Sequence, residues 1–468
     1  MKCVLSLFLF VVSVVAAETA LDRYVKAPDS HYKYEVVKTI PGKDYTVYVV
    51  ELTSQAWLTE KEVDKPVWKH WLTIVKPDRV DHSVGFLVIG GGSNRDRAPE
   101  RADGFITQVA TITHSVAAEL RNVPNQPLTF VGDGKPRSED SIIAFAWAKF
   151  LHGGSELWLP RLPMTKSAVR AMDTVTAVMA QQGGTKVDRF VVTGGSKRGW
   201  TTWTTAATDS RVVAIVPAVI DLLNIEPSFR HHWQVYGAWS PAVKDYYEND
   251  IMRWSGTPRY REMLKIVEPY EYRDRLTMPK YIVNATGDEF FLPDSSQFYF
   301  KDLKGEKHLR YVPNTKHSLA GSDARETIGA FYSMVLNNRP RPRYEWKFEK
   351  NGAIVVKTTD RPTEVKLWQA TNPEKRDFRL DVIGKAFQAT VLQEARPGVY
   401  VGKVPKPAKG WTAYFVELTY PSGISFPLKV TTGVRVIPDV YPYKAPKLGS
   451  AAGPGPTSIP PAEPNVTN

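Results

Sequence analysis

The sequence predicts an α/β protein, with a doubly wound and mostly parallel β-sheet followed by a C-terminal β-sandwich. From about residue 70 to 335, apolar strand-like runs alternate with longer runs of helical periodicity. This alternation is typical of a parallel sheet covered by helices on both faces. From about residue 343 onward, short alternating runs are separated by Gly, Pro and Asn, which indicates an all-β sandwich. A chain of 468 residues is also long enough for two domains.

The expected strands of the first domain are rich in apolar or β-branched residues. In chain order they fall at residues 70–77, 84–92, 110–118, 187–195, 211–220, 279–288 and 307–317. Helices are expected at residues 141–151 and 166–182, and again directly after residue 195. In the helix at 166–182 the apolar residues fall close to one stripe, which a helix packed on a sheet requires: Val169, Met172, Val175 and Met179.

An aromatic-rich insertion, residues 222–278, separates two of these strands. Its aromatic residues include Trp233 and Trp239, and two histidines, His231 and His232, lie beside them. A segment of this kind can form a lid over a pocket, and a helical excursion packed on the sheet is the alternative. We expect the lid, with His232 and Trp239 in contact with the substrate.

The two ends of the chain are expected to lie outside both domains. Residues 1–17 combine a basic start, an apolar run and small residues before Glu18, a pattern typical of a secretory signal peptide. An uncleaved anchor is the alternative, although the run is short for a membrane span. Residues 444–468 are rich in Pro, Gly, Ser and Ala and are expected to be disordered. The α/β domain then occupies residues 18–340 and an immunoglobulin-like β-sandwich residues 341–443, with a secreted or periplasmic location and no later transmembrane segment.

Composition excludes several kinds of chemistry. The only cysteine, Cys3, lies in the signal segment, so the mature chain has no thiol, no disulfide and no thiolate metal site. The formal net charge is +12, but the basic residues are scattered, which indicates a solvated basic surface rather than a nucleic-acid site. His231 and His232 lack a third metal ligand at a readable spacing. We therefore expect no metal, no other cofactor and no nucleic-acid partner.

Ser196 is the candidate nucleophile. The stretch "FVVTGGSKRGW" places it on a glycine-rich turn between an expected strand and an expected helix. Nucleophilic acyl transfer by serine needs a hydroxyl on such an exposed, sharp turn, together with an imidazole base and a carboxylate that orients it. A structural Gly-Gly-Ser turn is the alternative, and the strand–turn–helix context favours the nucleophile.

A candidate acid and a candidate base follow in the chain order Ser, Asp, His, which is that of α/β-hydrolases. Asp288 comes just after an expected strand in "NATGDEFFLPDSS", with Glu289 and Asp294 as competitors. Asp294 could instead cap the helix that follows it. His317 lies in the loop after the last expected strand, where a general base belongs.

Backbone N–H groups should stabilise the oxyanion of the reaction. The N–H of Lys197, one residue after the nucleophile, is the usual first donor. Gly91 or Gly92 in "IGGGSNRD" is the candidate for the second, and a tight glycine turn is the alternative. Arg198 stands where a nucleophile elbow usually has a small residue. We expect its side chain, or that of Lys197, to meet an anionic or sugar-acid group of the substrate.

The chain resembles the PhoPQ-activated pathogenicity-related protein family over roughly residues 20 to 440. The stretches that carry the resemblance are "FLVIGGGSN", "FVVTGGSKRGWTTW", "AIVPAVIDLLN", "EPYEYRDRL" and "PKYIVNATGDEFFLPDSS" through "YVPNTKHSL". The resemblance implies an α/β-hydrolase fold with Ser196, Asp288 and His317 as triad, and identifies no substrate. Glycine three residues after the serine, at Gly199, is similar to the arrangement in glucuronoyl esterases.

These features together predict a secreted or periplasmic serine hydrolase that cleaves esters or amides. Ser196 attacks, His317 acts as base and Asp288 orients the imidazole. The expected substrate is a small molecule, a carbohydrate ester or a peptide. The alternative is a catalytically weak α/β-hydrolase scaffold that serves as a secreted signalling or binding protein.

Overall fold

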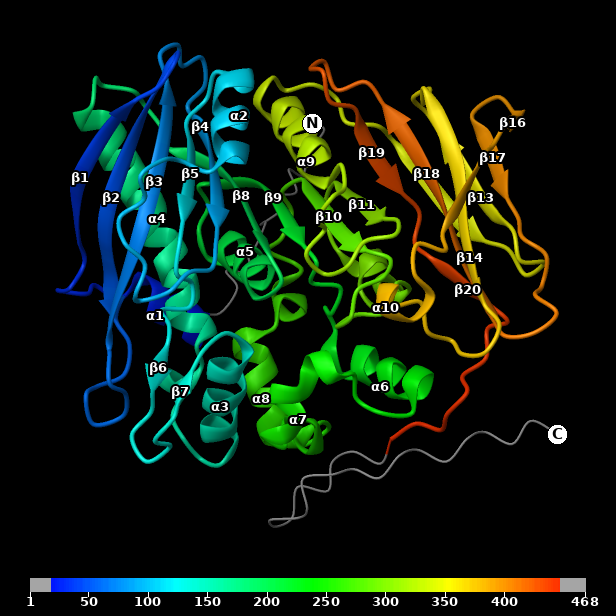
Figure 1. Ribbon diagram of the computed structural model, residues 1–468, viewed down its shortest axis with the longest axis horizontal. Helices are drawn as coiled ribbons and strands as arrows, with labels where there is room; N and C mark the ends of the chain where they lie inside the picture. The colour runs from blue at the N-terminus through cyan, green and yellow to red at the C-terminus, as the bar shows by residue number, and fades with distance from the viewer. Residues whose placement is uncertain (1–17, 447–468) are drawn as a thin grey trace, which may run out of the picture.

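A nine-stranded sheet forms the centre of the molecule in the computed structural model, which describes residues 18–446 (Figure 1). Its strand order is β1-β2-β3-β5-β4-β8-β9-β10-β11. Pairing is antiparallel from β1 to β5 along this order and parallel from β5 to β11. The strands are β1 (Lys33–Pro41), β2 (Tyr45–Ala56), β3 (Val67–Pro77), β4 (Val84–Ile89), β5 (Ala117–Leu120), β8 (Arg189–Gly195), β9 (Val212–Ala218), β10 (Lys280–Ala285) and β11 (Lys307–Val312).

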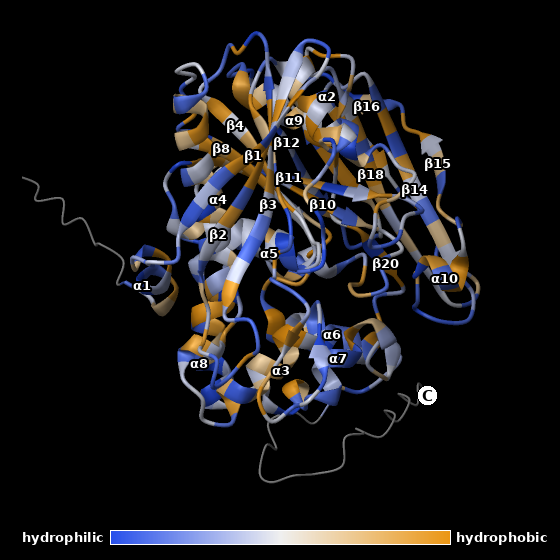
Figure 2. Ribbon diagram, turned by 60° about the vertical axis from the view of Figure 1, so that its left-hand side comes forward, coloured by the Kyte–Doolittle hydropathy of each residue, from blue (hydrophilic) through white to orange (hydrophobic). Residues whose placement is uncertain are grey.

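Helices cover both faces of this sheet, so its central strands are buried on both sides, as the near-continuous apolar runs predict. Val192 of β8 packs in a core with α4 and α5, and its neighbour Val191 packs in a second core with α2 and α9. Figure 2 shows the apolar character of β4 and β8. The helices are α1 (Ala20–Lys26), α2 (Gly104–Thr113), α4 (Arg161–Gln181), α5 (Lys197–Thr208) and α9 (Ala324–Leu336). The predicted doubly wound, mostly parallel sheet is confirmed.

The prediction of a strand at residues 110–118 is wrong for its first half. Helix α2 continues to Thr113, His114 ends it in the left-handed conformation, and only Ala117–Leu120 form a strand. Asp103 starts the helix, because its carboxylate accepts the N–H of Phe105 at 2.8 Å. The run of β-branched residues favours a strand locally, but packing against β3, β5 and α9 outweighs this preference.

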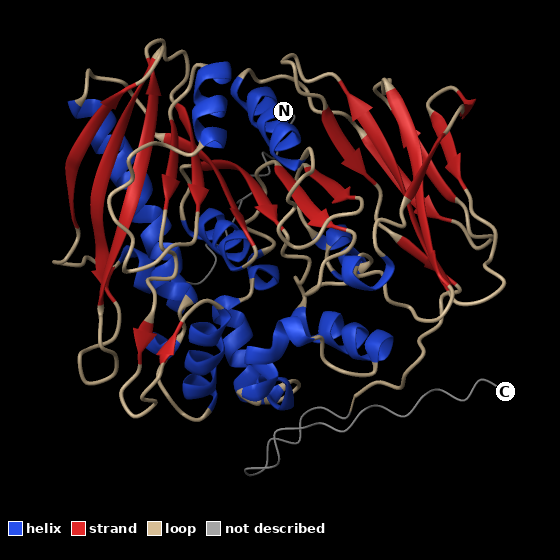
Figure 3. Cartoon of the chain, in the orientation of Figure 1, coloured by secondary structure: helices blue, strands red, loops and turns tan. Residues whose placement is uncertain are grey.

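A layer of short helices lies beyond the carboxyl ends of the parallel strands (Figures 1 and 3). The insertion between β9 and β10 contributes α6 (Ile225–Tyr236), α7 (Lys244–Glu248) and α8 (Pro258–Val267), with 3-10 turns η2 (Pro241–Val243), η3 (Ile251–Trp254) and η4 (Pro269–Tyr272). The segment between β5 and β8 adds α3 (Asp140–Leu151), the turn η1 (Glu156–Trp158) and a small ribbon of β6 (Leu128–Thr129) and β7 (Pro136–Arg137). Ligands of open α/β sheets bind at this end of the strands.

The C-terminal part consists of two antiparallel sheets that pack face to face. One contains β12 (Tyr344–Phe348), β13 (Ile354–Thr358), β16 (Glu394–Arg396) and β17 (Val399–Gly402). The other contains β14 (Glu364–Asn372), β15 (Gln388–Val391), β18 (Trp411–Tyr420), β19 (Leu428–Thr431) and β20 (Arg435–Ile437). Val356 of the first sheet and Leu367 and Val416 of the second share one buried core. The predicted β-sandwich is confirmed, and its immunoglobulin-like character stays a prediction.

Buried polar contacts join the sandwich to the α/β domain. Arg310 of β11 donates to Glu417 of β18, and both side chains are 2% exposed. Arg310 also pairs with Asp323 at 3.0 Å, and Lys429 of β19 pairs with Asp323 at 2.6 Å. A short helix of the sandwich, α10 (Leu380–Ile383), contacts the loop after β10, where the N–H of Leu380 donates to the carbonyl of Gly287 at 3.1 Å. The sandwich thereby supports a loop of the candidate site.

The expected signal segment and nearly all of the expected tail lie outside the described residues. Between residues 18 and 446, no helix is both long and apolar enough to cross a membrane.

Candidate active site

Ser196 occupies a strained turn between β8 and α5. Its φ of 57° and ψ of −125° are costly for a residue with a side chain, by about 1–3 kcal/mol. The N–H of Ser196 donates to the carbonyl of Ala218 at 2.9 Å, and its own carbonyl accepts the N–H of Trp200 at 2.9 Å as α5 begins. A Cβ at Gly199 would lie 2.8 Å from the Ala218 oxygen, so only glycine lets the helix approach this closely. These contacts hold the serine at the tip of an elbow.

His317 and Asp288 form a directly bonded pair. Nδ1 of His317 lies 2.8 Å from Oδ2 and 3.0 Å from Oδ1 of Asp288. The Asp288 carboxylate also accepts the N–H of Phe290 at 2.8 Å, which fixes its orientation. When Nδ1 carries the proton toward this carboxylate, Nε2 is left with a lone pair. Nε2 of His317 is buried and has no hydrogen-bond partner among the described residues.

A small cavity of about 30 Å³ has Ser196 in its wall. Ser196, Phe290 and Phe291 line it, and the ring of His317 lies 4.3 Å from that of Phe290 and 5.8 Å from that of Phe291. Within residues 18–446, no hydrogen bond joins the Ser196 hydroxyl to His317. In unliganded sites such bonds are often long and tighten only with substrate.

The competing carboxylate Asp294 has other partners. It pairs with Nε2 of His231 at 2.8 Å and with Nη2 of Arg376, a residue of the sandwich, at 2.7 Å. Burial alone raises the pKa of Asp294, but the charge of Arg376 and the contact with His231 hold it well below its usual range. Asp294 is thus a buried anchor between the insertion and the sandwich, and it is not bonded to His317.

Asp221 is another buried carboxylate near the site, and no sequence motif marks it. It follows β9 and accepts hydrogen bonds from the hydroxyls of Tyr299 at 2.6 Å and Tyr311 at 2.5 Å. Burial raises its pKa to about 8, since these two hydroxyls only partly offset the loss of water. Both of its oxygens are occupied by tyrosine, so it does not orient the histidine either.

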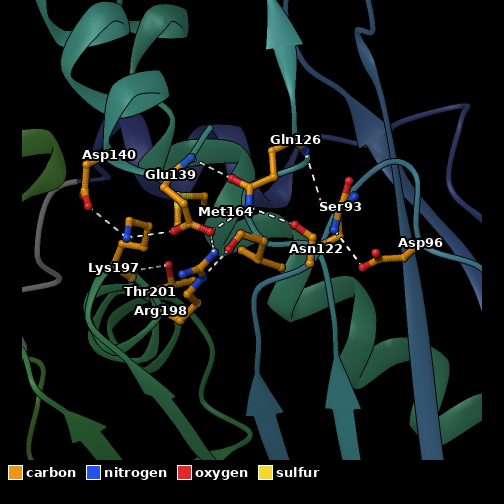
Figure 4. A network of polar contacts seen from close by, with 12 residues as sticks. Ser93, Asp96, Asn122, Gln126, Glu139, Asp140, Met164, Lys197, Arg198 and Thr201 are labelled. Atoms are coloured by element: carbon orange, nitrogen blue, oxygen red, sulfur yellow. Dashed lines mark hydrogen bonds and ion pairs between the residues drawn. The ribbon is translucent and has the colours of Figure 1, made fainter. Parts of the chain in front are cut away.

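The two basic residues after the nucleophile are neutralised by acidic residues at the start of α3 (Figure 4). Nζ of Lys197 lies 2.9 Å from Glu139 and 3.0 Å from Asp140. Nη2 of Arg198 lies 2.6 Å from Glu139, and its Nε donates to the carbonyl of Val123. Lys197 lines the cavity, whereas Arg198 does not belong to the lining. The geometry gives no support to Arg198 as a substrate ligand, because its guanidinium is taken up within the protein.

The same polar network reaches the glycine-rich loop after β4. The amide of Gln126 donates to the carbonyl of Gly92 at 2.9 Å and to Glu139 at 2.6 Å (Figure 4). A Cβ at Gly91 would lie 2.9 Å from Nη2 of Arg198, so the loop packs directly on the elbow. In the described part of the chain, the N–H groups of Gly91 and Gly92 have no acceptor. Lys197 lines the cavity beside Ser196, whereas Gly91 and Gly92 do not, so the oxyanion donors stay a prediction.

His232 and Trp239 belong to an aromatic cluster of the insertion and do not line the cavity. Nε2 of His232 accepts the N–H of Ser240 at 3.0 Å, and burial lowers its pKa to about 3. The ring of Trp239 lies 5.0 Å from that of Trp233 and 5.7 Å from that of His232. Their packing is that of a structural core, so the predicted substrate contacts find no support here. Other insertion residues do form a wall of the cavity: Leu222, Ile225, Phe229, Val243, Tyr246, Ile251 and Met252.

Three further residues of the wall lie on α3 and α4, and no sequence signal pointed to them as site residues. Asp140 and Trp147 of α3 and Arg161 of α4 line the cavity beside Ser196. No local motif marks them, because they lie at the start or on one face of ordinary helices. Across residues 18–446, no cluster of His, Cys, Asp and Glu has the arrangement of a metal site.

A serine elbow at the carboxyl edge of a sheet with this strand order, followed by an aspartate–histidine pair beyond its last two parallel strands, places the chain among proteins of α/β-hydrolase fold. Within that class, the chain belongs to the PhoPQ-activated pathogenicity-related protein family, whose sequence model matches residues 21–379.

Comparison with individual proteins finds similarity of two kinds. Autocrine proliferation repressor protein A of Dictyostelium discoideum is 39% identical over 480 residues, which covers 96% of this chain and 97% of that protein. Among solved structures, an acetyl xylan esterase from Paenibacillus sp. R4 is similar with a TM-score of 0.46 and 17% identity, over 69% of this chain and 96% of the esterase. A glucuronoyl esterase from Solibacter usitatus has a TM-score of 0.36 and 15% identity, over 64% of this chain and 86% of the esterase.

Proposed function

We propose that the protein is a serine hydrolase that cleaves an ester or amide bond through Ser196, His317 and Asp288. One observation carries the proposal: Nδ1 of His317 is bonded to the Asp288 carboxylate, and its Nε2 is buried without a partner among the described residues. The ring of His317 lies 4.3 Å from that of Phe290, which lines the cavity that also contains Ser196. A histidine held in this way can accept a proton from a serine hydroxyl.

In the proposed reaction, the Ser196 hydroxyl attacks the scissile carbonyl carbon and its proton passes to Nε2 of His317. The N–H groups of Lys197 and of Gly91 or Gly92 donate to the resulting oxyanion. The bond to the leaving group breaks as His317 returns the proton to it, which leaves an acyl group on Ser196. Water, deprotonated by His317, then releases the acid product and restores the serine. Asp288 stabilises the imidazolium in both halves.

Hydrolysis assays on panels of nitrophenyl esters, aminoacyl amides and acetylated sugars test this proposal. The native protein should cleave at least one class, and Ser196→Ala should reduce that rate by a factor of about 10³ or more. Equal rates for the native protein and Ser196→Ala would show that the activity resides elsewhere.

The second candidate is a catalytically weak scaffold that acts as a secreted signalling or binding protein. The observation in its favour is the name of the 39% identical Dictyostelium protein, which is that of a proliferation repressor. Under this candidate, Ser196→Ala leaves the biological effect of the added protein unchanged. Under the hydrolase proposal, the variant loses whatever part of that effect depends on bond cleavage.

We also propose that the protein is secreted or periplasmic. The support is the sequence of residues 1–17, with its basic start, apolar run and small residues before Glu18. Mass spectrometry of the N-terminus of protein recovered outside the cytoplasm tests it. A mature chain that begins at Glu18 is expected, and recovery of the intact chain from the cytoplasm alone would contradict it.

A further inference from the structure

Arg161, the first residue of α4, lines the cavity beside Ser196 although it is only 2% exposed. Its Nη1 donates to the carbonyl of Lys197 at 2.9 Å, and its guanidinium lies 4.6 Å from the centre of the Trp200 ring. Its Nε is buried with no hydrogen-bond partner, and no carboxylate of residues 18–446 is within ion-pair distance of Arg161. A buried arginine is thus held in place beside the nucleophile with no carboxylate of the described residues in direct contact.

The neighbouring carboxylates are already occupied. Glu139 contacts both Lys197 and Arg198, and Asp140 contacts Lys197 and accepts the hydroxyl of Tyr246 at 2.9 Å. Burial lowers the pKa of Arg161 to about 10, so the side chain remains a cation at neutral pH. An unmatched buried charge is costly to a folded protein, and such groups are concentrated at binding sites.

The free edge of Arg161 is the one that arginines in this chain use to bind carboxylates. Elsewhere in the structure, Nε and Nη2 of one guanidinium together contact the carboxylate of one acidic residue, in four pairs: Arg137 with Asp133, Arg211 with Asp209, Arg341 with Glu306 and Arg379 with Asp377. At Arg161, neither Nε nor Nη2 has a partner among the described residues. Two parallel N–H donors on one planar edge match the two oxygens of a carboxylate.

We propose that the cavity beside Ser196 binds a carboxylate of the substrate at Arg161, so that the protein acts on small esters or amides that carry a free carboxylate near the scissile carbonyl. The reaction part of this statement rests on the proposed hydrolase function, and the carboxylate site does not. Trp147, Trp200, Phe290 and the aliphatic residues of the insertion enclose the rest of the cavity, which suits the short hydrocarbon part of such a molecule. The small volume of the cavity, about 30 Å³, favours a short hydrocarbon part.

Calorimetric titration with succinate and with its neutral analogue succinamide tests the site without turnover, if Ser196→Ala is used as the background. Succinate should bind at least about ten-fold more tightly than succinamide, since a charged hydrogen-bonded pair contributes about that much or more. Arg161→Gln should abolish the difference, and Arg161→Lys should retain only part of it, because lysine lacks the planar fork. The matched control is Arg170→Gln, which removes an arginine of the same helix that lies over Tyr32 and outside the cavity.

Equal affinity for the two ligands in the Ser196→Ala protein would overturn the proposal, whether or not any Arg161 variant folds. Unchanged succinate binding in folded Arg161→Gln would overturn it as well, since the anion would then lie elsewhere.

A kinetic comparison separates recognition from a merely structural role. In Arg161→Gln, the ratio of kcat/KM for nitrophenyl hemisuccinate to that for nitrophenyl butyrate should fall about ten- to hundred-fold. If Arg161 only held the Lys197 carbonyl, kcat/KM would fall equally for both esters. A constant ratio would therefore overturn the proposal. Selective succinate binding without any Ser196-dependent hydrolysis would refute the hydrolase function but support the carboxylate site.

Discussion

Replacement of Glu139 by glutamine should destabilise the protein by removing the charge that balances Lys197 and Arg198. Both cations contact this carboxylate, at 2.9 and 2.6 Å, and both are largely buried. A hydrogen bond to a charged group contributes about 1.5–3 kcal/mol. The Glu139 side chain is 40% exposed, so solvent screening reduces the total, and we expect a loss of about 2 kcal/mol. For an α/β domain of this size, the loss corresponds to a melting temperature lower by about 3 °C.

The effect of Glu139→Gln should depend on pH. Burial alone raises the pKa of Glu139, but Arg198 and Lys197 bring it from its usual 4.5 down to about 2. Because the pKa is lower in the folded than in the unfolded state, this stabilisation is complete above about pH 4.5 and is lost as the pH falls toward 2. The gap in melting temperature between the native protein and Glu139→Gln should therefore be larger at pH 7 than at pH 3.

Scanning calorimetry at the two pH values measures this gap, with Glu262→Gln as the control. Glu262 also pairs with an arginine, Arg259 at 2.7 Å, but it is 55% exposed, so its loss should matter by less than about 1 kcal/mol. If Glu139→Gln melts like the control at pH 7, the network at the elbow does not stabilise the fold as described. A gap of equal size at both pH values would refute the electrostatic origin.

Three further substitutions test the catalytic residues and the structure that holds them in place. Asp288→Asn should lower kcat by a factor of about 10²–10⁴ with little change in melting temperature, since it disturbs the orientation of His317, and steady-state kinetics of the folded variant measures this. Asp294→Asn should instead destabilise the protein by about 3–5 kcal/mol, measured by calorimetry, and change kcat much less. If Asp294→Asn lowered kcat and Asp288→Asn lowered stability, then Asp294 would orient the histidine and Asp288 would be the structural anchor. Gly199→Ala should lower the melting temperature through a clash of about 1–3 kcal/mol, whereas Gly104→Ala, which meets open space, should not.

Much of the fold could be predicted because its signals are local. Strands such as β8 and β10 are buried on both faces, so they contain continuous runs of apolar or β-branched residues, at 190–193 and 281–283. Such runs can be recognised in the sequence alone. Gly194 and Gly199 mark the sharp turn at Ser196, because a Cβ there would lie 2.7 and 2.8 Å from backbone oxygens. The order of Ser196, Asp288 and His317 follows from strand order, since each comes just after the carboxyl end of a parallel strand.

The features that the sequence mispredicts or does not reveal depend on residues that are distant in the chain. The run before His114 has strand-forming residues, and its helical state depends on the Asp103 cap and on packing against distant elements. The direction of the Arg198 side chain depends on Glu139, which is 59 residues earlier in the chain. Arg161 carries no motif at all, and its importance appears only when its neighbours are found to be paired with other groups.

Covalent labelling by a fluorophosphonate, followed by mass spectrometry of the peptides, tests directly whether Ser196 is an activated nucleophile. Such reagents react with a serine only when a nearby base activates its hydroxyl. A single adduct on Ser196 is expected in the native protein, absent in Ser196→Ala and formed much more slowly in His317→Ala. A folded native protein that remains unlabelled at Ser196, or that is labelled at the same rate without His317, would contradict this role of Ser196.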